Sequence, residues 1–407
     1  MKKYLKWDVI VIFVVSYLIR NIGKIVSGDI AKPFIDGDSL YIKDGIIEEI
    51  GWSISRKADG IIDVNGMTVI PGLFDSHVHP VFGDYTPRQN TLGFIESSVH
   101  GGVTTFVSAG EVHLPGRPRG DKEAAKALAI LAHKTFKNFR PLGAKVHAGA
   151  LLLEKGMTEQ DFDDVVKEGV WLVGEVGLGT VQDPDEASEL VRFAQSRGMK
   201  VVIHTGGASI PGSTIINAEV VLKVRPDVVS HINGGPTSPP INDIRKIIEN
   251  TQAAIEVVQC GNFRSMIATV KFLKDRNELS RLIIGNDMPS GTGVLPLGII
   301  RTIAFLASNA GISAEEAVCA ATGNTARAFG LKEGIIREGK PADIVVLDVP
   351  YGSSASDALE AFTIGDIPGI AMVMIDGITR VGRSRMTPPP TRTVKIEGEV
   401  KLPEGGH

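Results

Sequence analysis

The pattern of apolar and polar positions divides the chain into two kinds of segment. Over residues 17–66, short apolar runs alternate with turn residues, and Asp44-Gly45 between two such runs is typical of a β-hairpin. From residue 67 the rhythm changes to an apolar strand, a loop and a helix, repeated many times. Strand-like runs return at residues 340–348 and 371–377. The pattern therefore predicts a small β-sandwich domain built from both chain ends, with an α/β domain between them.

The α/β part contains eight apolar strand candidates separated by helical patterns such as residues 121–139 and 263–277. The strand candidates are residues 69–74, 103–108, 145–150, 171–176, 200–204, 227–231, 253–258 and 281–285. Eight strands alternating with helices over roughly 270 residues predict a (β/α)8 TIM barrel. A doubly wound open sheet is the alternative, but no G-x-G-x-x-G motif follows the first strand.

These patterns predict four regions. Residues 1–16 form an N-terminal extension, 17–66 plus 340–385 the β-sandwich domain, 67–339 the barrel and 386–407 a C-terminal arm. The lysine-rich start and the apolar run at residues 9–15 resemble a signal peptide, but no small-residue cleavage site follows. The apolar stretch is too short to span a bilayer, so we expect an extension or an extra edge strand.

The amino-acid composition argues against several classes of function and site. The chain is 43% hydrophobic and 22% charged, with a formal net charge of -4, which is ordinary for a soluble globular protein and argues against a nucleic-acid partner. Only Cys260 and Cys319 occur, which argues against a disulfide framework or a cysteine zinc site. We expect a cytoplasmic protein without a membrane partner.

Histidines and carboxylates mark the ends of five strand candidates. A TIM barrel places its active site at the carboxyl ends of its strands, so residues at these ends should meet in one pocket. His77 and His79 alternate, so in an extended chain both imidazoles face one side. The complete set is His77, His79, Glu175, His204, His231 and Asp287.

Taken singly, each of these residues has a structural explanation. His204 and His231 can be core histidines, Glu175 can be paired with a buried arginine, and Asp287 can cap a turn. Their shared position at strand ends favours metal ligation instead. Four histidines and two carboxylates exceed the needs of one zinc ion and suit two metals about 4 Å apart with a bridging carboxylate.

These residues carry a resemblance to the amidohydrolase superfamily. The matching motifs are the Pro71-Gly72 lead into His77-Val78-His79, the Gly101-Gly102-Val103-Thr104-Thr105 stretch, the strand-end histidines, Asp287 and residues 339–345. The resemblance implies a barrel with a β-sandwich domain and metal-dependent hydrolysis. Many binuclear members carry a carboxylated lysine on the fourth strand, where this chain has Glu175, a carboxylate that can bridge two cations itself.

More narrowly, the chain is similar to the enamidases, a group within that superfamily. The similarity lies in residues 20–28, 83–89, 115–118, 174–179, 204–207, 230–237 and 285–287. It implies hydrolysis of 6-oxo-1,4,5,6-tetrahydronicotinate to 2-formylglutarate and ammonia in nicotinate degradation, a zinc–iron pair or two zinc ions, and a homotetramer. The alternatives are another cyclic amidohydrolase of the hydantoinase or dihydroorotase type, a deaminase of the superfamily, and a catalytically silent scaffold.

With this resemblance we expect separate roles for the six residues in holding the metals and in acid–base chemistry. His77, His79 and Asp287 hold one metal, His204 and His231 hold the other, and Glu175 bridges them. Asp287 then acts as general base toward the attacking water and as general acid toward the departing nitrogen. A substrate carboxylate requires a cationic or N–H-rich anchor, for which the candidates are Arg117, His147, Gly206 and Gly207.

Overall fold

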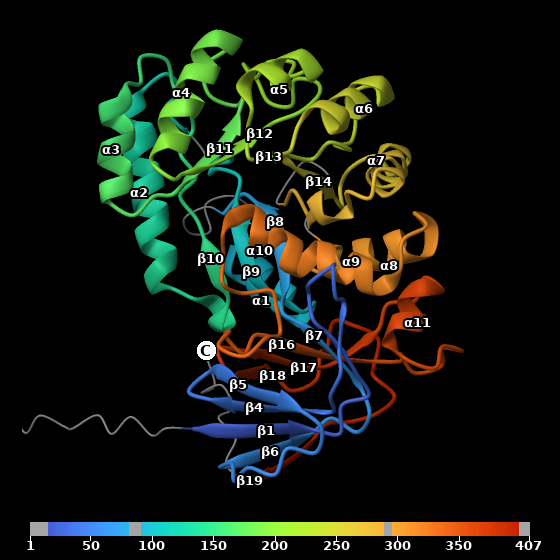
Figure 1. Ribbon diagram of the computed structural model, residues 1–407. Coiled ribbons are helices and arrows are strands. Elements are labelled where there is room, and N and C mark those ends of the chain that lie inside the picture. The colour runs from blue at the N-terminus through green and yellow to red at the C-terminus, as the bar shows by residue number, and fades with distance from the viewer. Residues whose placement is uncertain (1–14, 81–90, 115, 289–294, 399–407) are drawn as a thin grey trace, which may run out of the picture.

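A computed structural model describes residues 15–80, 91–114, 116–288 and 295–398. Two parts are visible in Figure 1: an upper α/β part, and a lower β part in which the first and last strands of the chain lie together. The β part consists of two sheets with strand orders β19-β6-β1-β4-β5 and β18-β17-β16-β7-β2-β3. Both sheets therefore combine strands from the two ends of the chain.

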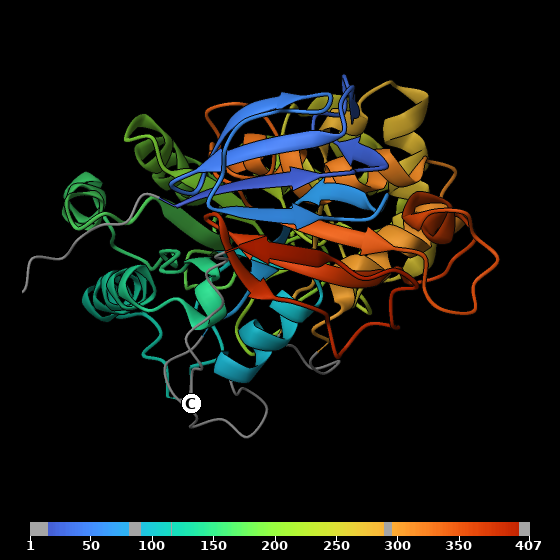
Figure 2. The same cartoon turned by 90° about the horizontal axis from the view of Figure 1, so that it is seen from below.

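The strands of the two sheets are short, and Figure 2 shows them from below. Their bounds are β1 (Ser16–Arg20), β2 (Lys24–Val26), β3 (Phe34–Ile35), β4 (Ser39–Lys43), β5 (Ile46–Gly51), β6 (Gly60–Asp63), β7 (Thr68–Pro71), β16 (Ile344–Asp348), β17 (Gly369–Ile375), β18 (Ile378–Val381) and β19 (Lys395–Gly398).

Alternating side chains give the six-stranded sheet two buried faces. Along β16, Ile344 and Val346 belong to the core between the two sheets, with Leu40 and Ile62 of the other sheet. Val345 and Leu347 belong to the core of the α/β part. Because successive side chains of a strand point to opposite faces, an unbroken apolar strand can join two cores. This sheet fixes the β part to the α/β part.

Within the described residues, the α/β part contains eight strands, and an α-helix follows each of them. In chain order the strands are β8 (Leu73–Val78), β9 (Val103–Ser108), β10 (Lys145–His147), β11 (Leu172–Val176), β12 (Lys200–Ile203), β13 (Val228–Val229), β14 (Ala254–Val258) and β15 (Leu282–Gly285). They form parallel sheets of three and five strands, β10-β9-β8 and β11 to β15 in order. Single parallel bridges, Leu151 to Val173 and Val78 to Met288, span the two gaps between the sheets.

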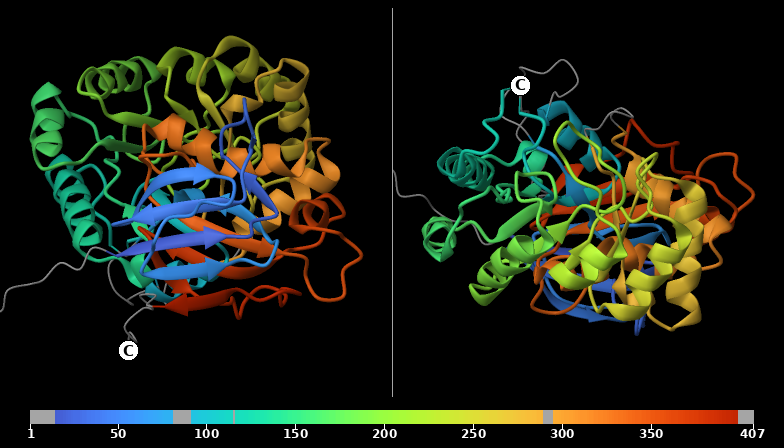
Figure 3. Two further views of the ribbon diagram at one scale, coloured as in Figure 1. Left: turned by 60° about the horizontal axis from the view of Figure 1, so that its bottom comes forward. Right: turned by 90° about the horizontal axis from the view of Figure 1, so that it is seen from above.

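The eight helices surround these strands, as the two views of Figure 3 show. They are α1 (Thr91–His100), α2 (Lys122–Asn138), α3 (Glu159–Lys167), α4 (Pro184–Ser196), α5 (Ala218–Val224), α6 (Ile241–Asn250), α7 (Phe263–Asp275) and α8 (Gly298–Asn309). Short helical turns η1 (Pro141–Gly143) and η2 (Leu279–Arg281) precede β10 and β15. Among the described residues, no helix has both the length and the apolar character needed to cross a membrane.

The expected first barrel strand, residues 69–74, is divided between the two parts of the molecule. Its first half is β7, which pairs with β16 and β2, and its second half opens β8. The change occurs at Gly72, whose N–H donates to Asp343 O at 2.9 Å. The strands of the α/β part therefore begin a few residues later than the predicted residue 67, because the apolar run serves two sheets in succession.

Two features lie toward the C-terminal end. Residues 314–329 form three consecutive helical pieces, α9 (Ala314–Cys319), the π-helical η3 (Ala320–Asn324) and α10 (Thr325–Phe329), and Thr325 Oγ1 donates to Ala320 O within them. The expected C-terminal arm contributes β19, which pairs antiparallel with β6. Residues 1–14, most of the predicted extension, lie outside the described residues, and a further helix, α11 (Ala358–Thr363), follows β16.

Gly72 provides a test of how closely the two parts approach. A Cβ atom at this position would lie 2.1 Å from Thr104 Oγ1 and 2.8 Å from Thr104 Cβ, and Thr104 is fully buried. We expect Gly72→Ala to lower the free energy of unfolding by about 1–3 kcal/mol, because overpacking forces neighbours to shift. Gly382→Ala, where no atom lies within 4 Å of the added Cβ, is the matched control in thermal unfolding. Equal melting temperatures for the two variants would contradict this packing.

Candidate metal centre

All six residues that the sequence places at strand ends meet at one end of the α/β part. His77 lies in β8 and His79 directly follows it, Glu175 lies in β11, and His204 directly follows β12. His231 and Asp287 each come two residues after the end of a strand. Potential ligand atoms form two groups in which all members lie within 4.8 Å of one another: His77 with His79 and Asp287, and Glu175 with His204 and His231.

The first group joins two imidazoles and a carboxylate. The Nε2 atoms of His77 and His79 are 3.3 Å apart. Asp287 Oδ1 lies 3.6 Å from the first of these atoms and 3.3 Å from the second. Three potential donors thus face one small volume, within the range that a single divalent cation can coordinate.

Glu175 connects the first group to the second. Its Oε1 lies 2.6 Å from His231 Nε2 and 3.6 Å from His204 Nδ1. Its Oε2 lies 3.6 Å from His77 Nε2, on the side of the first group. One carboxylate therefore offers a different oxygen to each group, which is the arrangement of a bridging ligand.

Hydrogen bonds on the far side of each ring fix which nitrogen carries the proton. His77 Nδ1 lies 2.7 Å from Glu256 Oε2, and His79 Nδ1 lies 2.7 Å from Gly110 O, so in the neutral rings these nitrogens are the donors. The two Nε2 atoms that face each other then both carry lone pairs. Lone pairs and carboxylates that converge in a buried space repel one another unless a cation lies between them, so the residues present fit a metal.

Protonation of the rings is the alternative source of positive charge. Burial by itself would lower the pKa of His77, but the carboxylates of Glu256, Glu175 and Asp287 outweigh burial and hold its pKa well above the usual value. For Glu175, burial would raise the pKa, but the charges of His231 and His77 hold it well below the ordinary value. The directions of these two pKa shifts indicate an excess of buried carboxylates, which cations must balance, either protons or metal ions.

Glu256 contacts two of the candidate ligands, and the sequence interpretation missed it. It is fully buried in β14, where Oε2 accepts from His77 Nδ1 and, at 3.1 Å, from His231 N, while Oε1 accepts from Ser76 Oγ. It thus orients a member of each group. The available signal was a single carboxylate inside the apolar run Ile255-Glu256-Val257-Val258. A buried carboxylate requires partners, and here the partners include two candidate ligands.

The backbone is also specialised at the candidate ligands. His231 and Asp287 have positive φ angles of 29° and 58°, a region that residues other than glycine rarely adopt. Gly285 makes room for β8, because a Cβ atom there would lie 2.7 Å from His77 Cβ. Strained backbone at two of six candidate ligands is typical of a functional site held in place by its surroundings.

The four residues proposed as substrate contacts are placed differently from expectation. The N–H groups of Gly206 and Gly207 donate to Ile216 O and Thr237 O, both at 2.8 Å, so neither is available to hold a substrate carboxylate. Gly207 instead orients a candidate ligand, because its carbonyl oxygen lies 2.8 Å from His204 Nε2. The N–H groups of both glycines are thus used within the fold, and the carbonyl group of Gly207 supports the centre.

His147 and Arg117 lie in different surroundings. The ring of His147 packs edge-on against Trp171 at 5.4 Å, and burial lowers the pKa of His147 to about 4. This environment is that of a side chain packed within the fold. Arg117 is half-buried and donates to Leu178 O at 3.3 Å, three residues beyond Glu175, so its position leaves the anchor hypothesis open.

A segment after β9 lies against the first group. His113 packs edge-on against the ring of His79, with centroids 5.0 Å apart. Glu111 is buried beside it, accepts from Ser108 Oγ and Gly149 N, and has its pKa raised to about 7 by burial. Neither His113 nor Glu111 was among the residues that the sequence analysis singled out.

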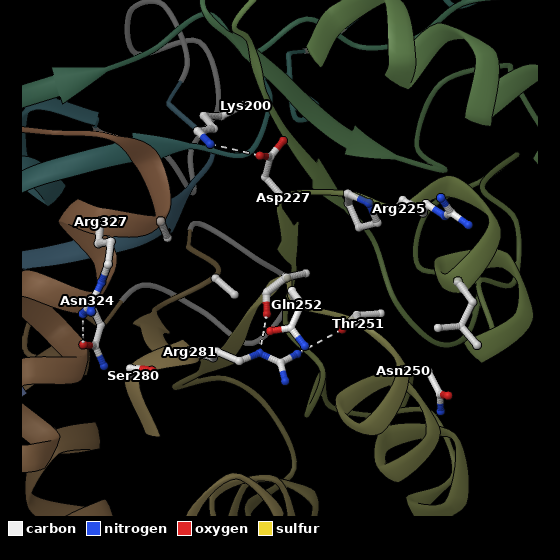
Figure 4. Close-up of a pocket in the computed structure, with 15 residues that line it drawn as sticks. Lys200, Arg225, Asp227, Asn250, Thr251, Gln252, Ser280, Arg281, Asn324 and Arg327 are labelled. Atoms are coloured by element: carbon white, nitrogen blue, oxygen red, sulfur yellow. Dashed lines mark hydrogen bonds and ion pairs between the residues drawn. The ribbon is translucent and has the colours of Figure 1, made fainter. Parts of the chain in front are cut away.

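A cleft lies elsewhere, at the opposite ends of the strands (Figure 4). It has a volume of about 780 Å³ and is lined where β12 to β15 begin. Its basic groups hold the chain together: Lys200 pairs with Asp227 at 3.0 Å, and Arg281 donates to Ala253 O at 2.9 Å. Lys200 and Arg281 are thus already paired within the fold. The cleft also lies at the opposite ends of the strands from the six candidate ligands, so it is not part of the candidate metal centre.

Comparison with known proteins agrees with this geometry. Residues 232–379 match the amidohydrolase family. The enamidase of Eubacterium barkeri is 51% identical over 382 residues, which cover 93% of this chain and 99% of that protein. The chain belongs to the amidohydrolase family. An imidazolonepropionase of Thermoplasma volcanium is also similar, at 25% identity over 86% of this chain and 97% of that protein.

Solved structures extend the comparison. A crystal structure of an enamidase matches with a TM-score of 0.90 and 50% identity, covering 94% of this chain and all of that one. The β-aspartyl dipeptidase of Fervidobacterium islandicum matches with a TM-score of 0.63 at 18% identity, covering 93% and 99%, and therefore shares the fold. These neighbours imply that this amidohydrolase has a TIM barrel with an additional domain.

The contact between Glu256 and His77 yields a test of the centre. We expect Glu256→Gln to weaken binding of a divalent metal about 10- to 100-fold, because a neutral amide orients the His77 ring less strongly than a carboxylate. The measurement is a titration of metal-free protein with Zn²⁺ against a chromophoric chelator. Glu249→Gln, on the exposed surface of α6, is the control. Unchanged affinity would show that Glu256 does not support the centre.

Proposed function

We propose that this amidohydrolase is an enamidase that converts 6-oxo-1,4,5,6-tetrahydronicotinate and two water molecules to 2-formylglutarate and ammonia. The first water opens the cyclic amide, and the second replaces the enamine nitrogen, which leaves as ammonia. The observation that carries the proposal is the pair of three-residue groups joined through Glu175. The 51% identity to an enamidase along 99% of its length supports the choice of substrate.

In this proposal the six residues hold two divalent cations. His77, His79 and Asp287 would hold one ion, His204 through Nδ1 and His231 through Nε2 would hold the other, and Glu175 would offer one oxygen to each. When bound, such a pair supplies a Lewis acid for the amide carbonyl and lowers the pKa of water. The all-nitrogen-and-oxygen donor set suits zinc, iron or both, and we propose a zinc–iron pair or two zinc ions.

Asp287 is the proposed general base and general acid. Its side chain is 21% exposed, whereas the side chains of the other five residues are at most 5% exposed, so Asp287 is the member that faces incoming water and substrate. A carboxylate oxygen of Asp287 would accept a proton from the attacking water and then deliver it to the ring nitrogen as the C–N bond breaks. Arg117 remains the proposed anchor for the substrate carboxylate.

The proposal also covers the closure of the barrel, the domain bounds, the cellular location and the oligomeric state. We infer that the two parallel sheets close into one (β/α)8 barrel through the bridges at Leu151–Val173 and Val78–Met288. The barrel region would run from about residue 73 to near residue 339, and the β-sandwich domain would combine residues 16–71 with 340–398, so that it includes β7 and β19. The enzyme would act in cytoplasmic nicotinate degradation as a homotetramer, and light scattering of the purified protein would test the tetramer.

The substrate proposal is tested by following ring opening and ammonia release together. The purified, metal-loaded protein is offered tetrahydronicotinate, hydantoin and dihydroorotate rings in parallel. We expect loss of ring absorbance and one ammonia per ring from the first compound alone, because only its enamine yields ammonia after ring opening. Ring opening of hydantoin or dihydroorotate, with none of tetrahydronicotinate, would overturn the enamidase proposal in favour of another cyclic amidohydrolase.

The role of Asp287 is tested by Asp287→Asn. We expect the turnover number to fall about 10²- to 10⁴-fold because the amide cannot accept the proton, while two equivalents of metal remain bound. Metal content by emission spectroscopy and initial rates of ammonia release measure the two quantities. Asp36→Asn, on the exposed surface of the β part, controls for loss of a carboxylate. A normal rate in Asp287→Asn would remove this residue from the mechanism.

A further inference from the structure

Asp287 has a second contact, on the side away from the histidines. Its Oδ1 faces the first group, and its Oδ2 accepts a hydrogen bond from Cys260 Sγ at 3.4 Å. Cys260 lies in the turn after β14 and is partly exposed. The two carboxylate oxygens are thus assigned to different partners, which defines the rotation of the carboxylate plane.

The turn that carries Cys260 is tied to the neighbouring strand end. Asn233 Nδ2 donates to Val258 O at 3.0 Å, and Val258 N donates to Asn233 Oδ1 at 2.8 Å. Asn262 N donates to Asn233 O just beyond the cysteine, and Gln259 N donates to Gly285 O at 3.0 Å just before it. Asn233 is fully buried. The backbone on both sides of Cys260 is therefore held in place.

The other partner is held as firmly. Asp287 N donates to His77 O at 3.0 Å, and the residue keeps its positive φ of 58°. Neither backbone can adjust easily, so the contact between thiol and carboxylate has a defined geometry. A thiol is a weak donor, but a hydrogen bond to a charged acceptor is stronger than one between neutral groups.

We propose that Cys260 is a positioning residue for catalysis, whose S–H donates to Asp287 Oδ2 and keeps Oδ1 directed at His77 and His79. This inference rests on the proposed role of Asp287. The thiol acts through the carboxylate and does not contact the reacting atoms. Its loss should disturb the step that depends on the orientation of Asp287 and leave substrate affinity unchanged.

The first arm of the test is kinetic. In the full-length, metal-loaded protein we expect Cys260→Ala to lower kcat about 5- to 20-fold with KM within about twofold, which corresponds to the loss of one modest hydrogen bond. Cys260→Ser should return kcat to within about threefold of the unaltered protein, because a hydroxyl can donate to the same oxygen. Cys319→Ala, which removes the other, fully buried cysteine, should keep the normal kcat.

The second arm needs no substrate. Each protein is loaded with Co²⁺, and the visible absorption bands report the ligand field of the centre. We expect the bands to shift in Cys260→Ala and to match the unaltered protein in Cys260→Ser and Cys319→Ala. If the unaltered protein fails to bind Co²⁺ or to open the ring, the proposed function fails, irrespective of the comparison between the variants.

Three results would overturn the role of Cys260 itself. The first is normal kcat and normal Co²⁺ bands in Cys260→Ala. The second is equal loss in the alanine and serine variants, which would indicate packing in place of a hydrogen bond. The third is a raised KM with unchanged kcat, which would place the thiol against the substrate.

Discussion

The placement of one buried carboxylate organises this molecule. Glu175 is almost inaccessible to solvent, and a charge in such a position is costly unless partners surround it. Four histidines supply those surroundings, with ring nitrogens 2.6 to 4.0 Å from its carboxylate oxygens, and they come from β8 and from the segments that follow β8, β12 and β13. Strands far apart in the chain must therefore bring their carboxyl ends together, which ties the arrangement of the α/β part to the chemistry of its centre.

Residues that contact the histidines from outside determine which nitrogen of each ring faces the centre. Glu256, Gly110 and Gly207 each accept a hydrogen bond from the outer nitrogen of a histidine, so the inner nitrogens present lone pairs. Without these acceptors the rings could rotate or change tautomer, and the same six residues would form an ordinary polar cluster. One acceptor is a side chain within a strand, and the other two are carbonyl groups of loop residues. Both strands and loops at the carboxyl ends of the strands therefore support the centre.

The sequence allowed the six residues at the strand ends to be predicted, but not their supports. A strand-end histidine is visible because polar residues are unusual in an apolar run, and the fold then dictates where the run ends. Backbone acceptors such as Gly110 carry no sequence signal, since every residue has a carbonyl group. The glycine pair Gly206-Gly207 was predicted as an anion site, yet its N–H groups are used within the fold. Similarly, the division of residues 69–74 at Gly72 depends on a pairing with β16, more than 270 positions away.

The two groups of candidate ligands differ in burial, and this difference bears on their chemical roles. His204 and His231 are buried with Glu175, whereas Asp287 is the exposed member of the first group and contacts a second polar residue, Cys260. A ligand that only held a cation would gain from complete burial, as the other five do. A partly exposed carboxylate at a strained backbone position, with one oxygen directed inward and the other held by a donor, is suited to exchange protons with a substrate. In the proposed function, the partial exposure of Asp287 therefore distinguishes a reactive centre from a structural one.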